Sequence, residues 1–408
     1  MLISRNDTLR LVLGGIALMK IKGIVIYSFW KLIFYFLFLI GKYRKQERNL
    51  LIVDIQAIRD SIMASPIIKN LRENVSNNCM IDIVCSGIQK PIYERFVEID
   101  NIYVIHSFEE YYLKNRKKFL GRDLYKIQYS FYVFKYVLNN LINKYNVVIE
   151  PRWEEDTVFT SILIMLIGAK NRYGFSEKVN KNKARRNFWR DKYFTKCFLH
   201  EAACYEGDKF LDLIEDIGYH IKTRKVKLSY NHSTSYNDMW GEYAVLALDT
   251  SDNRKEWDCD NFITTAQYII ESGLSVVLLG VKTDNGDYVY SKIASNNCFN
   301  YVGKTTLSEA IDIIGNSSFY IGCDTGLSHI AGSVGVPGIA IFPNSKLENP
   351  ESVSSVTRLR PSRNTIVIQP DLPLYPCTTD CLSKGKAHCI NEVKPEDVIM
   401  VIEHLLKI

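Results

Sequence analysis

The chain has 408 residues, of which 47% are hydrophobic and 24% are charged, so it is long enough for two ordinary domains and is not a disordered protein. The formal net charge of +6 comes from one end, because residues 1–48 hold nine basic and two acidic residues and leave 42 basic against 43 acidic elsewhere. This distribution argues against a nucleic-acid-binding body and favours a local anionic partner such as a lipid surface.

An aromatic and apolar run, IVIYSFWKLIFYFLFLI, occupies residues 24–40 and is followed by the basic stretch KYRKQER. A spanning helix usually needs about 20 apolar residues, and no small-residue cleavage site follows the run. Trp30 and Tyr35 favour the membrane interface, where the Lys31 ammonium can reach the headgroups. We therefore expect residues 1–48 to be a membrane-associating segment, a monotopic anchor in preference to a spanning or a packed helix.

Strand-like and helix-like runs alternate from residue 49 onward, which predicts a parallel sheet. NLLIVDI, MIDIVC, IYVIH and NVVIEP read as strands, and helices are expected in residues 127–144 and 156–167, among others. The first strand leads into DIQAIRDSIMASP, which offers Asp60 at a helix start either as a helix cap or as a functional carboxylate. The basic stretch NKNKARRNFWRDK is predicted to be a solvated loop, or one that meets an acidic acceptor.

A second alternation follows in YAVLAL, SVVLLG, SFYIGCD and GIAIF, so two α/β units stand in series. We place the boundary near residue 235 in YNHSTSYND, which has the composition of a linker. The expected domains are therefore residues 49–235 and 236–408. Ligands of open parallel sheets bind beyond the carboxyl ends of the strands, so the two units are expected to enclose a cleft.

The stretch GCDTGLSHIAG lies between a buried strand and a short helix, and it predicts an anion site. Amides at a helix start and the helix dipole attract phosphate, and Gly326 permits a close approach to the backbone. Asp324, Thr325 and His329 are the polar candidates here. Their alternatives are ordinary: Asp324 and Thr325 turn the chain and cap the helix, and His329 is a core histidine.

A second polar loop, LALDTSDNRKEW, follows the first strand of the second unit and places Thr250, Ser251 and Lys255 at the same edge of the sheet. Lys255 is either a phosphate ligand or a solvated surface base. No Asp-x-Asp pair stands at a comparable strand end, so we expect no metal in the chemistry and no cofactor.

Most of the ten cysteines are expected to be reduced core residues. PCTTDCLSKGKAHCI is different, because Cys377, Cys381 and Cys389 lie close together. A disulfide, a metal site and loop packing all remain open for them; His388 is the obvious further ligand, although its position next to Cys389 is poor spacing for zinc.

The order of these motifs resembles glycosyltransferase family 9, the heptosyltransferase-like enzymes of lipopolysaccharide assembly. The resemblance covers residues 49 to the end, and its most specific part is YIGCDTGLSHIAGSVGVPGIAIF. It implies two facing Rossmann-like domains in the GT-B arrangement, with the last helix packed back on the first domain. Asp324, Thr325, Gly326 and His329, with Thr250, Ser251 and Lys255, would contact a nucleotide diphosphate sugar, and no metal would be needed.

The first loop departs from the family pattern Arg-Leu-Gly-Ala-Ile-Gly-Asp. Asp60 matches, but Asp54, Gln56 and Arg59 do not, and Arg59 is either an added phosphate contact or an obstruction. The resemblance implies an inverting transferase, with Asp60 as the base, that extends a lipid-linked glycan at the cytoplasmic face of the inner membrane. The alternative is a membrane-tethered, catalytically degenerate binding protein.

Overall fold

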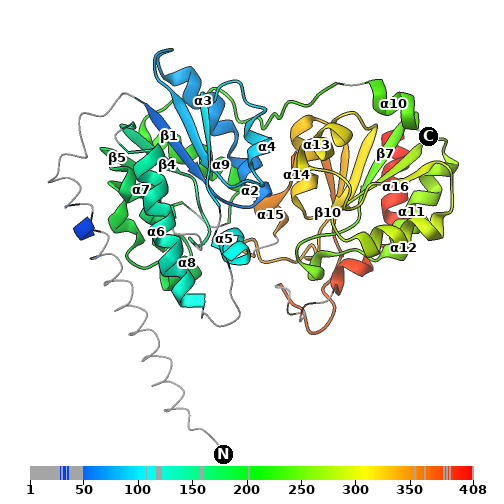
Figure 1. The fold of residues 1–408 in the computed structure, drawn as a ribbon. Coiled ribbons are helices and arrows are strands. Elements are labelled where there is room, and N and C mark those ends of the chain that lie inside the picture. Colours follow the sequence, from blue (N-terminus) through cyan, green and yellow to red (C-terminus); the bar gives the residue numbers. More distant parts are fainter. Residues whose placement is uncertain are drawn as a thin grey trace, which may run out of the picture.

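The computed structural model describes residues 49–106, 108–115, 122–142, 144–156, 160–200, 203–232, 234–352, 355–362, 364–379 and 387–406, with residues 28, 31–33, 35, 382 and 385. Within these residues no helix is both long enough and apolar enough to cross a membrane. The expected membrane-associating segment, residues 1–48, lies almost entirely outside them. Figure 1 shows that the described residues from 49 onward form two α/β domains, which lie side by side.

The N-terminal domain is built on a six-stranded parallel sheet in the order β3-β2-β1-β4-β5-β6. Its strands are β1 (Leu50–Asp54), β2 (Ile81–Cys85), β3 (Asn101–Val104), β4 (Val147–Glu150), β5 (Asn171–Phe175) and β6 (Lys196–Phe198). Its helices are α2 (Ile58–Ala64), α3 (Pro66–Asn74), α4 (Lys90–Tyr93), α5 (Phe108–Asn115), α6 (Arg122–Asn140), α7 (Thr160–Ile167), α8 (Lys181–Arg186) and α9 (Glu206–Ile217).

The C-terminal domain repeats this plan with a parallel sheet in the order β12-β11-β10-β7-β8-β9. Its strands are β7 (Tyr243–Ala247), β8 (Ser275–Leu279), β9 (Cys298–Asn300), β10 (Phe319–Cys323), β11 (Gly338–Ile341) and β12 (Thr365–Ile368). Its helices are α10 (Thr234–Trp240), α11 (Cys259–Glu271), α12 (Thr283–Ile293), α13 (Leu307–Gly315), α14 (Gly326–Val334), α15 (Val356–Leu359) and α16 (Pro395–Leu406).

The central strands are apolar along their whole length because helices cover both faces of each sheet. All five residues of β1, β7, β8 and β10 are buried. Two apolar clusters flank each sheet, one on either face. The expectation of two parallel-sheet α/β domains is therefore confirmed.

Two local expectations were wrong or shifted. The basic stretch expected to be a solvated loop contains α8, and the Lys183 ammonium is buried and donates to the carbonyl oxygen of Arg152 at 2.7 Å. Arg190 of the same stretch pairs with Glu150 in the core. The helix expected from residue 156 begins at Thr160, whose amide donates to the Asp156 carboxylate at 3.0 Å.

The chain passes from one domain to the other earlier than residue 235. Thr223 still bonds the first domain, because its carbonyl oxygen accepts from the Asn70 side chain at 2.7 Å. Leu228 bonds the second, because its amide donates to the Ser333 carbonyl at 3.0 Å. The crossing lies in a segment without regular structure, and α10 already forms part of the second domain.

The last helix, α16, packs against α11 in its own domain. The expectation that it returns to the first domain was therefore wrong. Val398 and Ile402, one helical turn apart, are fully buried in the apolar cluster that also contains Trp257. This apolar stripe finds its partner surface within the C-terminal domain.

Candidate functional site

The two domains meet where α2 and α14 begin, each directly beyond the carboxyl end of a central strand. Thr325 is the N-cap of α14, and its hydroxyl accepts from the Leu327 amide at 3.1 Å. A Cβ at Gly326 would lie 2.8 Å from Cγ2 of Ile58 in α2. The group that approaches Gly326 closely in this structure is thus a side chain of the other domain, and the close approach of a ligand stays a prediction.

Asp324 is a buried carboxylate that pairs with the Lys255 ammonium across the C-terminal sheet edge. Its other oxygen, Oδ1, has no hydrogen-bond partner among the described residues. Burial raises the pKa of this carboxyl, but the cations Lys255 and Arg59 outweigh it and hold the pKa below its ordinary value. Asp324 is therefore ionised at neutral pH and fixes a cation at the strand end.

His329 lies one turn into α14 and is fully buried. Neither ring nitrogen has a hydrogen-bond partner in the described part of the chain. Burial is the main cause that lowers the pKa of His329 to about 3, and the repulsion of Arg59 is the second. The imidazole is therefore neutral at neutral pH. It is thus not the satisfied core histidine of the ordinary alternative, because both of its buried nitrogens lack a partner among the described residues.

Asp60 stands in the first turn of α2, and its N-cap is Ala57, without a side-chain cap. The interpretation of Asp60 as the helix cap was therefore wrong. The Arg59 Nε atom donates to the Asp60 carboxylate at 2.9 Å. Burial opposes the charge of Arg59, yet the carboxylates of Asp60, Asp324 and Glu206 together raise its pKa. Arg59 therefore lies between the domains as a permanently charged group.

Thr250 and Ser251 follow β7, the strand beside β10, as predicted. The Thr250 hydroxyl donates to the Asp252 carbonyl at 2.6 Å and accepts from the Asp252 amide at 3.1 Å, so it closes a turn. Ser251 is exposed. Among the described residues, no hydrogen bond joins Thr250 or Ser251 to Asp324 or Arg59. Of this loop, only Lys255 therefore belongs to the charge cluster, which also contains Asp324, Arg59 and Asp60.

The sequence did not predict a second ionic contact between the two domains. Arg358 of α15 pairs with Glu206 at the start of α9 and with Glu154 at 2.8 Å. Burial raises the pKa of Glu206, and Arg358 only partly offsets this effect. No local pattern marks these residues, because Glu206 and Arg358 are 152 positions apart.

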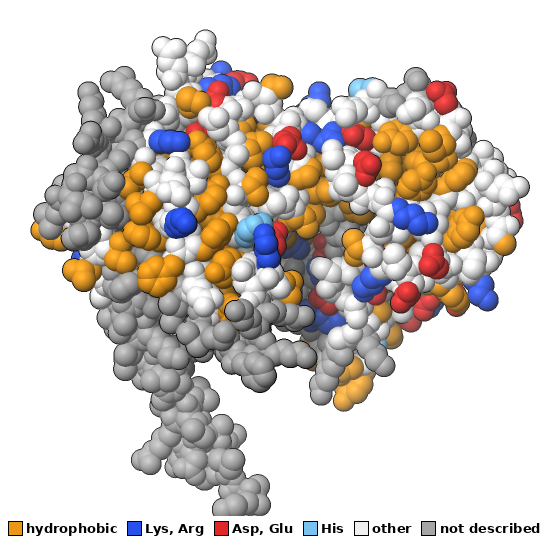
Figure 2. All heavy atoms as spheres, in the orientation of Figure 1, with side chains coloured by type: hydrophobic (Ala, Val, Ile, Leu, Met, Phe, Trp, Pro, Cys, Tyr) orange, Lys and Arg blue, Asp and Glu red, His pale blue; other side chains and the backbone are white. Residues whose placement is uncertain are grey.

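Arg95, which follows α4, also links the first domain to the second. Its guanidinium donates to the Asp312 carboxylate at 2.7 Å and to the Ser308 carbonyl at 2.9 Å, both in α13. Figure 2 shows basic and acidic side chains around the hollow between the two domains. The arrangement brings two helix starts, two cations and two carboxylates to one point between the sheets. Such a point can receive an anion and remove a proton from a group beside it.

Comparisons with known proteins agree with this arrangement. The family model for glycosyltransferase family 9 (heptosyltransferase) matches residues 139–365. Two curated proteins named lipooligosaccharide heptosyltransferase 2 are similar in sequence. The one from Haemophilus influenzae is 32% identical over 112 residues, 26% of this chain and 32% of its own. The one from Haemophilus ducreyi is 26% identical over 158 residues, 37% of this chain and 44% of its own, so each match spans less than half of the relative.

Solved structures extend the likeness to nearly the whole chain. The glycosyl transferase family 9 protein of Veillonella parvula has a TM-score of 0.67 at 16% identity, over 90% of this chain and 99% of its own. The ADP-heptose lps heptosyltransferase II of E. coli has a TM-score of 0.65 at 16% identity, over 88% and 99%. At such identities the likeness establishes the fold. Since the family model covers more than half of the residues, the chain belongs to glycosyltransferase family 9.

Proposed function

We propose that this protein is an inverting glycosyltransferase that moves a sugar, heptose or a related one, from a nucleotide diphosphate sugar to a lipid-linked glycan. The observation that carries the proposal is the cluster of Lys255, Asp324, Arg59 and Asp60 at the meeting point of α2 and α14. E. coli heptosyltransferase WaaC has been solved with ADP and with ADP-2-deoxy-2-fluoro heptose, which makes ADP-heptose the first donor to test.

The leaving nucleotide diphosphate gains negative charge as the glycosidic bond breaks, and the α14 amides, Lys255 and Arg59 would stabilise it. Asp324 repels a phosphate, so its role is to hold Lys255 in place. The neutral His329 retains a nitrogen that can accept a hydrogen bond from a donor hydroxyl. Asp60 would accept the proton of the attacking acceptor hydroxyl, which then displaces the nucleotide in one inverting step with no metal required.

A second candidate, a catalytically degenerate binding protein, is favoured by the loop after β1. The Gln56 amide is held by the Asp54 carboxylate at 2.6 Å, and Arg59 is held by Asp60. Both side chains fill positions where the family pattern has glycine. The Asp60 carboxylate is thus engaged by the Arg59 guanidinium in this structure. Turnover separates the two candidates, because only the enzyme consumes the donor.

The direct test is release of ADP from ADP-heptose by the purified protein, with and without a lipid-linked glycan acceptor that lacks heptose. We expect release that depends on the acceptor. A thermal-shift series with ADP, UDP and GDP then identifies the base, since a nucleotide that binds only the folded protein raises its melting temperature. Nucleotide binding without turnover on any acceptor would support the degenerate candidate.

The lipid-linked acceptor and the cytoplasmic membrane surface rest on the sequence of residues 1–48, with its aromatic run and basic excess. Co-sedimentation of the full chain with anionic and with neutral vesicles tests this part. We expect binding to the anionic vesicles that weakens as salt rises. Equal or absent binding to both would remove the membrane from the proposal without touching the transfer chemistry.

A further inference from the structure

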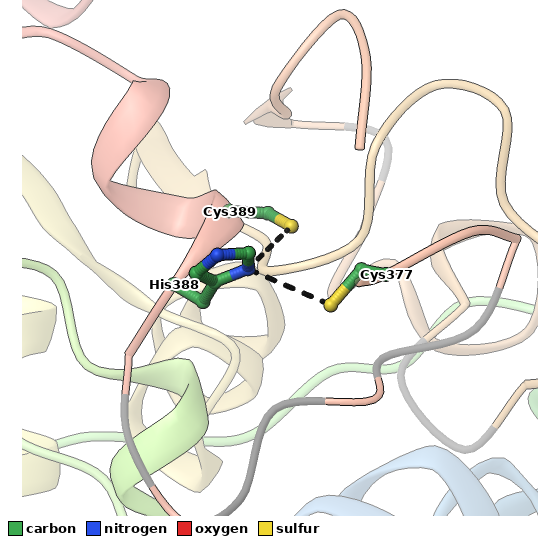
Figure 3. Close-up of side chains that lie close together, drawn as sticks. All are labelled: Cys377, His388 and Cys389. Carbon is green, nitrogen blue, oxygen red and sulfur yellow. Dashed lines mark hydrogen bonds between the residues drawn. The ribbon is translucent and has the colours of Figure 1, made fainter. Parts of the chain in front are cut away.

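A cluster of three metal-ligating side chains lies outside the charge cluster, in the segment between β12 and α16. The ligand atoms of Cys377, His388 and Cys389 all lie within 4.8 Å of one another. In Figure 3 one ring nitrogen of His388 faces both sulfurs. This nitrogen, Nδ1, is 3.6 Å from Sγ of Cys377 and 3.4 Å from Sγ of Cys389.

These separations match a tetrahedral metal site. A zinc ion binds cysteine sulfur at about 2.3 Å and histidine nitrogen at about 2.0–2.1 Å, which at a tetrahedral angle puts sulfur and nitrogen roughly 3.5 Å apart. A hydrogen bond explains the pair less well, because one Nδ1 atom carries one proton or one lone pair and two sulfurs approach it. A single cation between the three atoms satisfies all of them.

Backbone amides hold both sulfurs in place. The Leu382 amide donates to Sγ of Cys377 at 3.3 Å, and the Leu374 amide donates to Sγ of Cys389 at 3.3 Å. Amide hydrogen bonds of this kind orient metal-binding sulfurs. Both cysteines are only 7% exposed, so their sulfurs face the interior of the segment and not bulk water.

The neighbouring positions of His388 and Cys389 do not prevent joint ligation. His388 has φ of −143° and ψ of −95°, a backbone conformation outside the regular helix and strand regions. It lets two consecutive side chains reach the same point. The spacing objection from the sequence is therefore met by the geometry.

We propose that Cys377, His388 and Cys389 bind a divalent transition-metal ion, Zn²⁺ or Fe²⁺, in a structural site. Thiolate and imidazole ligands suit these two ions and disfavour Mg²⁺ and Ca²⁺. Cys381 lies outside the described residues.

The site has a structural role because its segment contacts two loops at the carboxyl ends of the strands. Pro343 and Ser345, directly after β11, line one small cavity with Cys377 and Cys389. On the other side, the Asn391 side chain accepts from the Asp258 amide at 3.2 Å, three residues after Lys255. The bound ion would therefore hold the segment between β12 and α16 against the loops after β11 and β7. It would take no part in the transfer step.

Metal analysis of tag-free protein, purified under reductant and exclusion of air, tests the proposal. We expect one equivalent of zinc or iron per chain, and elemental analysis tells the two apart. Loss of that equivalent is expected in Cys377→Ser and in His388→Ala, whereas Cys79→Ser, which changes a half-buried cysteine of the other domain, should keep it.

The wild-type chain alone gives a second test that does not depend on the variants folding. Removal of the metal by a chelator should lower the melting temperature, and Zn²⁺ should restore it, while Co²⁺ should give a thiolate charge-transfer band. Protein that takes up neither Zn²⁺ nor Fe²⁺ would overturn the proposal. So would metal retained in Cys377→Ser and His388→Ala, or a Cys377–Cys389 disulfide found by peptide mapping of the reduced preparation.

Discussion

The loops after β1 and β10 occupy equivalent places in the two domains, and they differ in what fills them. The loop after β10, called the open loop below, is made of small residues. Thr325 and Gly326 are half-buried at the start of α14, and the side chain packed against Gly326 is Ile58 of α2. The loop after β1 is filled by long side chains, Gln56 and Arg59, which are bonded to carboxylates of their own loop. The same fold thus places small residues beside one helix start and long polar side chains beside the other.

This difference suits the two loops to different roles in the proposed reaction. A small loop at a helix start can let a diphosphate approach the backbone. A carboxylate that accepts a hydrogen bond from an arginine is positioned more firmly than an unpaired one. The predictions below test each half, in order of decreasing effect.

The largest effect is expected for Asp60→Asn. Asparagine keeps the size and an oxygen that can accept from Arg59, but it cannot take a proton from the acceptor. Turnover should fall about 100-fold or more, the usual scale for loss of a general base, while donor affinity and melting temperature hold. All three are measured on one preparation. Asp284→Asn, an exposed acid in the first turn of α12, is the matched control and should leave turnover unchanged.

Near wild-type turnover in Asp60→Asn would show that the loop after β1 holds no base. A parallel loss of stability would instead mark Asp60 as a partner that Arg59 needs.

The second effect concerns the open loop. Lys255→Met should weaken nucleoside diphosphate binding about 10- to 100-fold, since a charge-assisted hydrogen bond to phosphate contributes about 1.5–3 kcal/mol. The melting temperature should also fall, because Asp324 is left as an unpaired buried charge. Calorimetric titration measures the first and thermal unfolding the second.

Lys255→Met combined with Asp324→Asn separates the two roles. Stability should return while the weak binding remains. Lys346→Met, which removes an exposed cation paired with Asp371, is the control and should change neither. Recovery of nucleotide affinity in the double variant would mean that Lys255 only neutralises Asp324.

The strands and the small loop were predictable because they are local patterns. Apolar runs such as SFYIG, ended by turn residues, can be recognised one segment at a time, and the motif after β10 was found in the same way. The described part of the chain confirms both sheets.

Contacts between distant segments could not be predicted. Lys183 and Arg190 read as solvated because their partners, the Arg152 carbonyl and Glu150, come from elsewhere in the chain. The Arg358–Glu206 pair and the contact of Ile58 with Gly326 arise only when the domains meet. Asp60 was found by its place after a strand, but its bond to Arg59 required the helix geometry.

A third, smaller effect is expected for Arg59→Gln. The Arg59 guanidinium faces Asp60, Asp324 and Glu206, so it adds one positive charge where the two helix starts meet. Its loss should weaken nucleoside diphosphate binding about tenfold, with a shallower salt dependence than wild type. Arg224→Gln, in an exposed pair with Asp208, is the control. Tighter binding in Arg59→Gln would identify the side chain as an obstruction and make the loop after β1 a degenerate version of the open one.

The smallest effect is a pH dependence of stability from His329 in the open loop's helix. Its folded pKa of about 3 lies below the ordinary value of 6.5, so between these values the unfolded chain binds the extra proton. The contribution is complete above pH 6.5 and is lost as pH falls toward 3, at up to about 1.4 kcal/mol per pH unit. We expect the free energy of unfolding of the wild type to fall more steeply between pH 6.5 and 5 than that of His329→Gln, measured by urea unfolding. Equal slopes would mean that folding does not lower the pKa of His329, which would contradict an imidazole buried without a partner.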